Sequence, residues 1–433
     1  MTGNRKRFVA LAPLLTFAIV LAGCGGRDAG NAKEERAEPV TLQLASQSVG
    51  TLLDEDFQEV VRTHLGKKYP HITINYNPET KGTTLTELIA AGSVPDIVVT
   101  YTGVLPSYRD MRLVMDMTSH FKNQGVDLDR FEPNYMTDVR KASDKGELYG
   151  LPINVNYHAM YYNKDIFDKF GVPYPTDGML WQGVIDLANR VTRMDGGVQY
   201  RGFDPGSTVQ WMSQPLAIAA IDPLTDKATM NNDSWKRVFE LARSIYSIPG
   251  NGLIAETPKN QFMKSRTLAM LLDLNILNQL AAPENAGLNW NVVQYPSYPE
   301  KPNTYGNASV YTVIATKASK YKDEAAKVID VITSEEVQLE LSRRGKLSPL
   351  RSENVKQALG AANSSLKDKG LPGIFKSKPV PYPVASTYRG KAEAIAIAKF
   401  KLYLEGALDV NTAIAQADEE INKRVDAEKG SAK

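Results

Sequence analysis

Two hydrophobic periods take turns along the chain from residue 40 onward. Segments 40–44 and 72–76 alternate apolar and polar residues, as half-buried strands do, and 95–99 is an apolar run typical of a buried strand. Between them, 52–65 and 85–91 repeat apolar residues at helical spacing. The order β-α-β-α-β predicts an α/β fold with a mostly parallel sheet flanked by helices. Any ligand site is then expected at the carboxyl ends of the strands.

A second set of elements begins near residue 150. Residues 151–162 form one extended run, which is too long for a single ordinary strand. The apolar spacing further along predicts strands over 267–272 and 309–315, and helices over 181–192, 234–245, 260–265, 322–344, 392–404 and 410–425. Strands and helices therefore continue to alternate through the second half of the chain.

The first 24 residues have a different pattern. Three cations at positions 5–7 precede a mostly apolar run that ends in Leu-Ala-Gly-Cys at positions 21–24. This order predicts a secretory signal peptide over 1–23, since a buried helix would leave the three cations without a packing role. Leu-Ala-Gly-Cys also resembles the lipobox of bacterial lipoproteins. We therefore expect lipid attachment at Cys24, which is the one Cys of the chain.

Composition narrows the classes of partner. Residues 24–39 have almost no apolar side chains and are predicted to form a flexible tether. The 433 residues carry 51 Lys and Arg against 49 Asp and Glu, and removal of 1–23 takes away three cations, which leaves a net charge of −1. This balance argues against nucleic acid as a partner. A single Cys excludes a disulfide framework, and outside the N-terminus no apolar stretch approaches the roughly 20 residues of a membrane span.

Several short motifs resemble those of one family when they are taken in order. They are GELYGLP at 146–152, YYNKDIF at 161–167, PYPT at 173–176, PDIV at 95–98 and TSEE at 333–336. Together they resemble the family 1 extracellular solute-binding proteins, the capture subunits of ABC importers, which include maltose-binding protein. The resemblance covers residues 40 to 425.

The resemblance implies the type II periplasmic-binding-protein fold, with two α/β lobes and a hinge that the chain crosses more than once. Lobe 1 is expected over 40–155 and 311–341, and lobe 2 over 156–310 and 342–433. Periodicity alone would suggest two consecutive domains, so this interleaving comes from the resemblance. The resemblance also implies a monomer that closes on a small solute and hands it to the transmembrane subunits of an ABC permease.

Candidate ligand residues follow the predicted strands or lie on the expected crossings. A sugar requires flat apolar ring faces and planar polar groups that bond its hydroxyls. By the resemblance, Trp211 aligns with an aromatic platform of lobe 2, meaning a ring on which a sugar stacks. The remaining candidates are Ser46, Gln47, Thr100, Tyr101, Asn154, Asn156, Tyr157, Asp273, Asn275, Tyr305 and Asn307.

Each candidate has a structural alternative. The aromatic rings can be core or rim residues, Asn154 and Asn156 can turn the hinge backbone, and Asp273 can cap the segment that follows it. Trp181, Trp235 and Trp290 fall within structural patterns, and we assign them to packing.

The candidate residues favour binding over catalysis. Only Asp273 among them is acidic, whereas a glycosidase requires two facing carboxylates. The four His residues lack metal-ligand spacing, no nucleophile elbow or phosphate loop is present, and we interpret His158 as a structural residue. We therefore expect no enzyme activity, no metal and no cofactor.

The resulting hypothesis is a lipid-anchored carbohydrate receptor, with an oligosaccharide as the expected solute. It would lie on the outer face of the cytoplasmic membrane or face the periplasm. The alternatives are a receptor of the same fold for a peptide, polyamine or oxyanion, and a sensor lipoprotein whose partner is a signalling receptor. The candidate loops are richer in amide and aromatic groups than in the cationic donors that oxyanion sites concentrate.

Overall fold

The computed structural model describes residues 38–47, 51–307, 309–381 and 386–431. The predicted signal peptide, Cys24 and nearly all of the expected tether lie outside these residues. The contacts divide the chain into Met1–Glu38 and a second unit, Pro39–Lys433, to which the elements named here belong. Within the described ranges, no helix combines the length and the apolar character needed to cross a bilayer.

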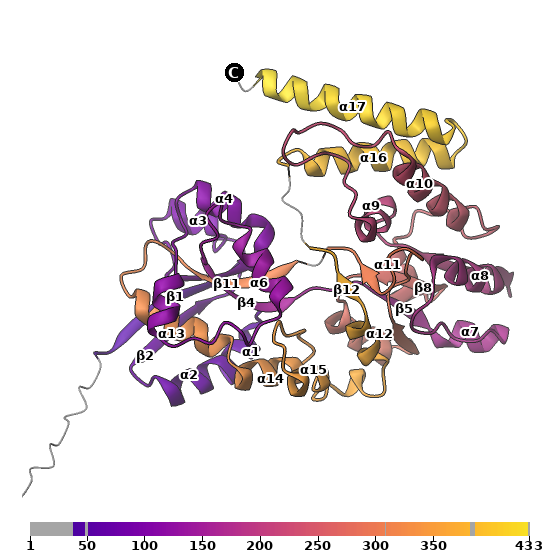
Figure 1. Cartoon of the computed structure of the whole chain (residues 1–433). Helices are drawn as coiled ribbons and strands as arrows, with labels where there is room; N and C mark the ends of the chain where they lie inside the picture. Colours follow the sequence, from indigo (N-terminus) through magenta and orange to yellow (C-terminus); the bar gives the residue numbers. More distant parts are fainter. Residues whose placement is uncertain (1–37, 48–50, 308, 382–385, 432–433) are drawn as a thin grey trace, which may run out of the picture. The chain divides into compact units, whose positions relative to one another are not determined.

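The first sheet has five strands in the order β2-β1-β3-β11-β4. Strand β1 pairs in parallel with β2 and β3, whereas β11 runs antiparallel to both β3 and β4. The strand β11 comes from late in the sequence, and Figure 1 shows it in orange among the indigo elements of this sheet. The bounds are β1 Val40–Ser46, β2 Ile72–Asn77, β3 Ile97–Tyr101, β4 Gly150–Val155 and β11 Val310–Ala315.

Helices form beside this sheet in the ranges 52–65 and 85–91 that the sequence predicts, and also in ranges for which no helix is predicted. Helix α3 starts with a capping box, because Thr84 Oγ1 accepts from the Glu87 amide while the Glu87 carboxylate accepts from the Thr84 amide. The helical bounds are α1 Asp54–Asp56, η1 Phe57–Val61, α2 Arg62–Lys68, α3 Leu85–Ala90, η2 Thr102–Val104, α4 Leu105–Asp110, α5 Thr118–Asn123, α6 Pro133–Arg140, α13 Lys322–Ile332, α14 Glu335–Arg343 and α15 Glu353–Gln357.

The single helix predicted over 322–344 is wrong, because the chain forms two helices there, α13 and α14. Thr333 Oγ1 donates to the Ile329 carbonyl at 2.8 Å, and the side chain of Ser334 caps α14 by accepting from the Val337 amide at 3.4 Å. Both helices bury an apolar face in the same core cluster, so the hydrophobic period continues through the break.

The extended run over 151–162 is also two elements. Strand β4 ends at Val155 and β5 begins at Ala159, and between them the chain passes from the first sheet to the second. The amide of Val155 donates to the Leu347 carbonyl and that of Asn156 to the Ser309 carbonyl, each at 2.9 Å. Three crossing segments, near residues 156, 309 and 347, therefore lie side by side.

The second sheet is mixed, with the order β6-β7-β8-β5-β9. Only β7 and β8 pair in parallel, whereas β6 with β7, β5 with β8 and β5 with β9 pair antiparallel. The expectation of mostly parallel sheets is therefore wrong, because two of the four pairings described in the first sheet and three of the four in the second are antiparallel. The bounds are β5 Ala159–Asn163, β6 Arg193–Asp195, β7 Val198–Asp204, β8 Leu268–Asp273 and β9 Trp290–Val293, and a separate short pair joins β10 Thr304–Tyr305 to β12 Lys378–Pro379.

The second sheet has its own set of helices, among which α16 and α17 run side by side (Figure 1). Helix α8 buries Trp181, Val184, Ile185, Ala188 and Val191, which recur at helical spacing. The bounds are α7 Lys164–Phe170, α8 Trp181–Val191, α9 Val209–Ser213, η3 Gln214–Leu216, α10 Asp233–Tyr246, α11 Pro258–Asn260, η4 Gln261–Ser265, η5 Leu277–Gln279, α12 Ala281–Asn285, η6 Ser364–Leu366, η7 Leu371–Lys376, α16 Arg389–Leu404 and α17 Val410–Ser431.

Each sheet has its own hydrophobic core. The packing assignment of Trp181, Trp235 and Trp290 is confirmed, since all three are buried in the cluster around the second sheet. The cluster around the first sheet extends to Leu350 and Val355, beyond the boundary at residue 341 that the resemblance implied for lobe 1. The candidate residues Asn156 and Tyr157 lie on the crossing between β4 and β5, whereas Gln47, Thr100 and Trp211 lie at strand ends or on α9.

Candidate ligand-binding site

Asn156 lies on the first crossing and bonds to elements of both sheets. Its Oδ1 accepts from the amides of Tyr157 and Asn275 at 3.1 Å each, and its Nδ2 donates to the Tyr311 hydroxyl at 3.5 Å. Tyr311 belongs to β11 of the first sheet, and Asn275 follows β8 of the second. A side chain with this placement is sensitive to any change in the crossing.

Trp211 is one of two candidate rings, with Tyr101, that retain an exposed part. It is half-buried on α9, and its ring centroid lies 4.9 Å from that of His158 in an edge arrangement at 65°. The His158 ring in turn stacks on Tyr305 at 5.8 Å and meets Tyr295 edge-on at 5.7 Å. The indole is therefore supported by a layer of buried rings, which is the arrangement that a stacking platform requires.

His158 is completely buried and neutral at ordinary pH. Burial lowers the pKa of its imidazole to about 3, and a hydrogen bond with the main chain of Asn307 offsets only part of this effect. Its Nδ1 has no hydrogen-bond partner among the described residues. The interpretation of His158 as a structural residue agrees with this packing.

Tyr157 and Tyr305 are buried rings, at 0% and 2% exposure. Burial raises the pKa of both phenols well above the ordinary value. Tyr157 donates its hydroxyl to Asn275 Oδ1 at 3.2 Å. Neither ring offers an open face for stacking, so the structure gives them the packing role that the sequence had left as an alternative.

Gln47, a candidate at a strand end of the first sheet, is already hydrogen-bonded to its neighbours. Gln47 Nε2 donates to the carbonyls of Thr83 and Ser46, at 2.9 and 3.1 Å, and its Oε1 accepts from the amide of Leu85. Thr100 is fully buried on β3, and Tyr101, at the end of that strand, is half-buried. The side chain of Gln47 thus holds the loop before α3.

Asp273 and Asn275 follow strand β8, as predicted, and both make hydrogen bonds inside the protein. Asp273 Oδ1 accepts from the Leu274 amide at 2.8 Å, and Oδ2 lies 3.2 Å from Lys259 Nζ. Burial raises the pKa of Asp273, while Lys259 opposes that shift. The alternative of a helix cap at Asp273 is wrong, because no helix begins at Leu274 and the bond goes only to the next residue.

A cavity of about 450 Å³ lies beside α9, η3 and α16. Its polar lining includes Gln210, Gln214, Asn307, Arg389 and Glu393. Glu393 accepts from Gln210 Nε2 and from Arg389 Nε, each at 2.7 Å, while the buried Gln214 Oε1 has no partner in the described part of the chain. Within the described part of the chain, Asn307 is the only predicted ligand residue that lines this cavity.

Sequence reasoning missed Gln210, Gln214, Arg389 and Glu393. The last two are spaced as a solvated i, i+4 ion pair on a helix, so the sequence offers no signal that they line a cavity. The two Gln residues come within the segment that carries Trp211 and could have been included with it. Asn154 is buried on β4, where its backbone pairs with Tyr311.

A model of a known protein family matches residues 56–366, under the description "Bacterial extracellular solute-binding protein". The match covers more than half of the chain and includes strands of both sheets. The protein belongs to this family.

A relative from Brucella abortus and two solved structures are also similar to this chain. The solute-binding protein is 23% identical over 370 residues to a binding protein of Brucella abortus (strain 2308), covering 82% of this chain and 84% of that one. A sugar transporter structure from Rhizobium etli, in an open conformation, superposes with a TM-score of 0.73 at 18% identity, covering 88% and 99% of the two chains. A Listeria monocytogenes ABC substrate-binding protein in complex with cycloalternan superposes with a TM-score of 0.70 at 18% identity. The match covers 90% of this chain and 99% of that one. These likenesses show the two-lobed fold.

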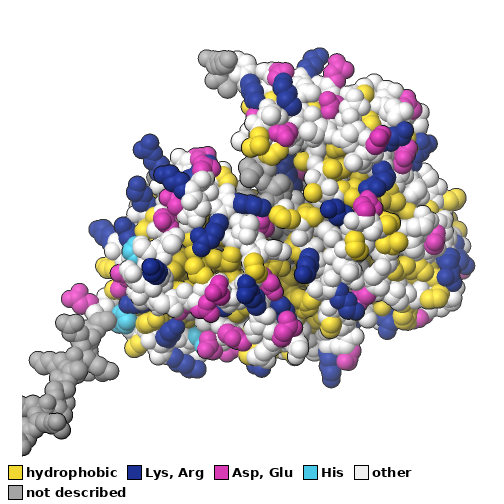
Figure 2. Space-filling model, viewed as in Figure 1, with side chains coloured by type: hydrophobic (Ala, Val, Ile, Leu, Met, Phe, Trp, Pro, Cys, Tyr) yellow, Lys and Arg dark blue, Asp and Glu magenta, His cyan; other side chains and the backbone are white. Residues whose placement is uncertain are grey.

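The surface charges of the solute-binding protein are intermixed. Figure 2 shows Lys and Arg side chains interspersed with Asp and Glu over the face drawn. Within the described residues, no group of three or more His, Cys, Asp or Glu side chains is placed to hold a metal ion. The polar lining of the cavity combines the amides of Gln210, Gln214 and Asn307 with the charged pair of Arg389 and Glu393.

Proposed function

We propose that this solute-binding protein captures a carbohydrate, with an oligosaccharide as the expected solute, and delivers it to the transmembrane subunits of an ABC permease. The observation that carries the proposal is the half-buried Trp211 ring, supported by the buried His158. Amide side chains at Asn156 and Gln210 lie on the adjoining crossing and on the same helix. A ring face together with planar amides is the combination that recognises a sugar.

The comparisons support this choice of solute. The Rhizobium etli structure is described as a sugar transporter, and the Listeria monocytogenes protein holds cycloalternan. Neither identity is high enough to carry a specific sugar over, so the proposal extends to the class of carbohydrates only.

Closure about the crossing segments would link binding to delivery. Asn156 is bonded to Tyr311 on one side and to Asn275 on the other, so a rotation of the lobes changes these contacts. A ligand that contacts both lobes stabilises the closed form more than the open form and shifts the equilibrium between them. The permease would then receive the liganded closed form.

We also propose that the protein is exported and anchored by a lipid at Cys24. The support is the lipobox-like sequence at positions 21–24, together with a family whose members are extracellular. A radioactive fatty acid fed to the native host should label the protein, and Cys24→Ser should abolish the labelling. Equal labelling of that variant would contradict the anchor and leave the ligand proposal intact.

The solute can be tested by thermal-shift screening of residues 39–433. The panel contains maltotriose, mannotriose, arabinotriose and cycloalternan, with peptides, spermidine, sulfate and phosphate as rivals. A ligand at about 100 times its Kd adds roughly 2.7 kcal/mol of stability, which is a clear rise in melting temperature. A rise with a carbohydrate that Trp211→Ala abolishes supports the proposal. A rise with only peptides, spermidine or anions contradicts it.

A further inference from the structure

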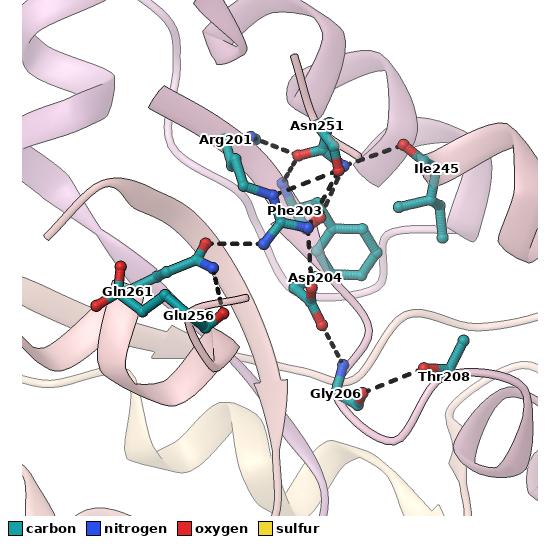
Figure 3. A network of polar contacts seen from close by, with 10 residues as sticks. Arg201, Phe203, Asp204, Gly206, Thr208, Ile245, Asn251, Glu256 and Gln261 are labelled. Carbon is teal, nitrogen blue, oxygen red and sulfur yellow. Dashed lines mark hydrogen bonds and ion pairs between the residues drawn. The ribbon is translucent and has the colours of Figure 1, made fainter. Parts of the chain in front are cut away.

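A buried charged pair lies on strand β7, immediately before the loop that leads to Trp211. Arg201 and Asp204 are 2% and 1% exposed, and Arg201 Nη2 lies 3.0 Å from Asp204 Oδ2 (Figure 3). Burial raises the pKa of Asp204, and the charge of Arg201 opposes that rise. Two buried charges of this kind are tolerated only when their hydrogen-bonding groups are satisfied.

Neutral amides complete the surroundings of Arg201. Its Nη1 donates to Gln261 Oε1 at 2.8 Å, and its Nε and Nη2 donate to the Asn251 carbonyl at 3.3 and 3.1 Å. The side chain of Asn251 accepts from the amides of Gly202 and Phe203 and donates to the Phe203 and Ile245 carbonyls. The guanidinium is thereby fixed to Asp204 of β7, to the loop after α10 and to η4 (Figure 3).

The second oxygen of Asp204 continues the network into the loop. Asp204 Oδ1 accepts from the amide of Gly206 at 3.0 Å, as Figure 3 shows. Gly206 has a φ of +69°, and a Cβ built on it would lie 2.4 Å from Cζ3 and 2.7 Å from Cε3 of Trp211. The indole therefore packs directly against the backbone of Gly206, at a distance that only a glycine permits.

Thr208 adds an independent observation. It is β-branched yet has a φ of +50°, a conformation that costs free energy for such a residue. It stands at the N-terminus of α9, and its carbonyl accepts from the Trp211 amide at 3.1 Å. The strained backbone is therefore that of Thr208, the N-cap residue of α9, which is the helix that carries Trp211.

We propose that Arg201 and Asp204 are positioning residues, which act through Gly206 to fix the Trp211 ring for stacking on a carbohydrate. The inference rests on the proposed function. Fixing a ring before the ligand arrives removes an ordering cost from binding. A buried ion pair adds little net stability compared with apolar residues of the same volume. The specific contribution of Arg201 is therefore to orient the Asp204 carboxylate toward the Gly206 amide.

The test uses Gly206→Ala, whose added methyl group would meet the Trp211 ring and also the Leu272 carbonyl oxygen, at 2.6 Å, while the two charged side chains stay unchanged. The protein is labelled with 6-fluorotryptophan, which places fluorine on Cη2, and ¹⁹F NMR then gives one resonance for each of the four Trp residues. Trp211→Phe identifies the Trp211 resonance. We expect Gly206→Ala to shift or broaden that resonance and to leave the other three in place.

The matched control is Gly197→Ala. Gly197 has a similar φ of +79° in the turn between β6 and β7, and nothing lies within 4 Å of a Cβ built on it. It therefore introduces the same backbone strain without contacting Trp211. An unchanged Trp211 resonance in Gly206→Ala, or an equal change in Gly197→Ala, would overturn the inference without any ligand being needed.

Asp204 is tested by a pair of variants. Asp204→Asn keeps an oxygen that can accept from the Gly206 amide, whereas Asp204→Ala removes it. We expect Asp204→Ala to broaden the Trp211 resonance more than Asp204→Asn does. Equal, unperturbed resonances in both folded variants contradict the positioning role of Asp204.

The last part of the test measures the affinity of each variant for the oligosaccharide that raises the melting temperature in the thermal-shift panel. We expect Gly206→Ala to weaken binding at least tenfold and Gly197→Ala to change it less than twofold, with similar melting temperatures. If Trp211→Ala weakens binding while Gly206→Ala moves the resonance and leaves affinity unchanged, the positioning inference fails alone. If Trp211→Ala leaves the affinity for every carbohydrate unchanged, the proposed platform itself fails.

Discussion

The strand ends of the two sheets use their polar residues differently. In the first sheet, the side-chain amide of Gln47 makes hydrogen bonds to Thr83, Ser46 and Leu85, and it thereby holds the loop before α3. In the second sheet, Asp204 also makes local hydrogen bonds. One of them holds the amide of Gly206, and the backbone of Gly206 packs against the half-buried ring of Trp211. A polar residue at a strand end can therefore serve a ligand site indirectly, by fixing the backbone on which an exposed group sits.

The two strand ends also differ in charge, since the Gln47 side chain is neutral whereas Arg201 and Asp204 form a buried ion pair. A lost amide contact in the first sheet leaves polar groups that neighbours or water can satisfy. A lost partner in the buried Arg201–Asp204 pair leaves an uncompensated charge in the core of the second sheet. The second sheet should consequently be the more sensitive of the two to single substitutions at these positions.

The largest effect is expected from Arg201→Met. It leaves Asp204 buried without its cation, which should cost about 3–5 kcal/mol of unfolding free energy. Urea unfolding of residues 39–433 measures the loss. The double variant Arg201→Met with Asp204→Leu should recover most of it, and a double variant as unstable as the single one would contradict the assignment of the cost to the buried charge.

Trp211→Ala should have the next largest effect, on affinity rather than stability. Removal of a stacked indole face should cost about 2–3 kcal/mol of binding free energy, or roughly 30- to 150-fold in Kd. Titration calorimetry with the oligosaccharide from the screen measures it. Tyr321→Ala serves as the control, because Tyr321 is an exposed ring that no contact joins to Trp211. Equal losses in the two variants would argue against a specific platform.

His158 should make stability depend on pH. Its folded pKa of about 3 lies below the ordinary 6.5, so between these values the unfolded chain binds one more proton. Its stabilising contribution is complete above pH 6.5 and falls by about 1.4 kcal/mol per pH unit as the pH drops towards 3. His158→Phe should remove that slope. The buried Asp204 and Asp273 have raised pKa values and act in the opposite direction, so the wild-type minus variant difference is the quantity to compare.

Gln47→Ala should have the smallest effect. Loss of its bonds to Thr83 and Leu85 should cost about 1–2 kcal/mol locally, and hydrogen exchange of the Leu85 amide should accelerate. Carbohydrate affinity should stay within threefold of the wild type. A tenfold loss of affinity would instead make Gln47 a direct ligand contact, as its position after the first strand predicts.

Much of the fold could be predicted from periodicity, because strands and helices bury one face at a regular spacing. Helix α8 and strand β8 lie within one residue of the ranges expected at each end. The break between α13 and α14 depends on the cap at Ser334, a local hydrogen bond that leaves the apolar period unchanged. The interleaving of β11 into the first sheet came from a family resemblance, since strand pairing leaves no periodic trace.

The candidate site was less predictable, because the sequence places residues without showing which face they present. Trp211 keeps an exposed part, whereas Tyr157 and Tyr305 are buried, and all three are simply aromatic residues near expected crossings. The packing of Trp211 against Gly206 leaves no room for a Cβ, which would lie 2.4 Å from Trp211 Cζ3, and only the folded backbone reveals it. Asp204 precedes a Pro-Gly turn in the sequence, a signal of loop geometry that gives no indication of a ligand site.

The most direct test of the account is a titration of the 6-fluorotryptophan-labelled protein with the oligosaccharide that raises its melting temperature. We expect the Trp211 resonance to move saturably, over the same concentration range as the thermal shift, while the resonances of the buried Trp181, Trp235 and Trp290 stay in place. A rise in melting temperature with an unmoved Trp211 resonance would show that the carbohydrate binds elsewhere, and it would contradict the central claim.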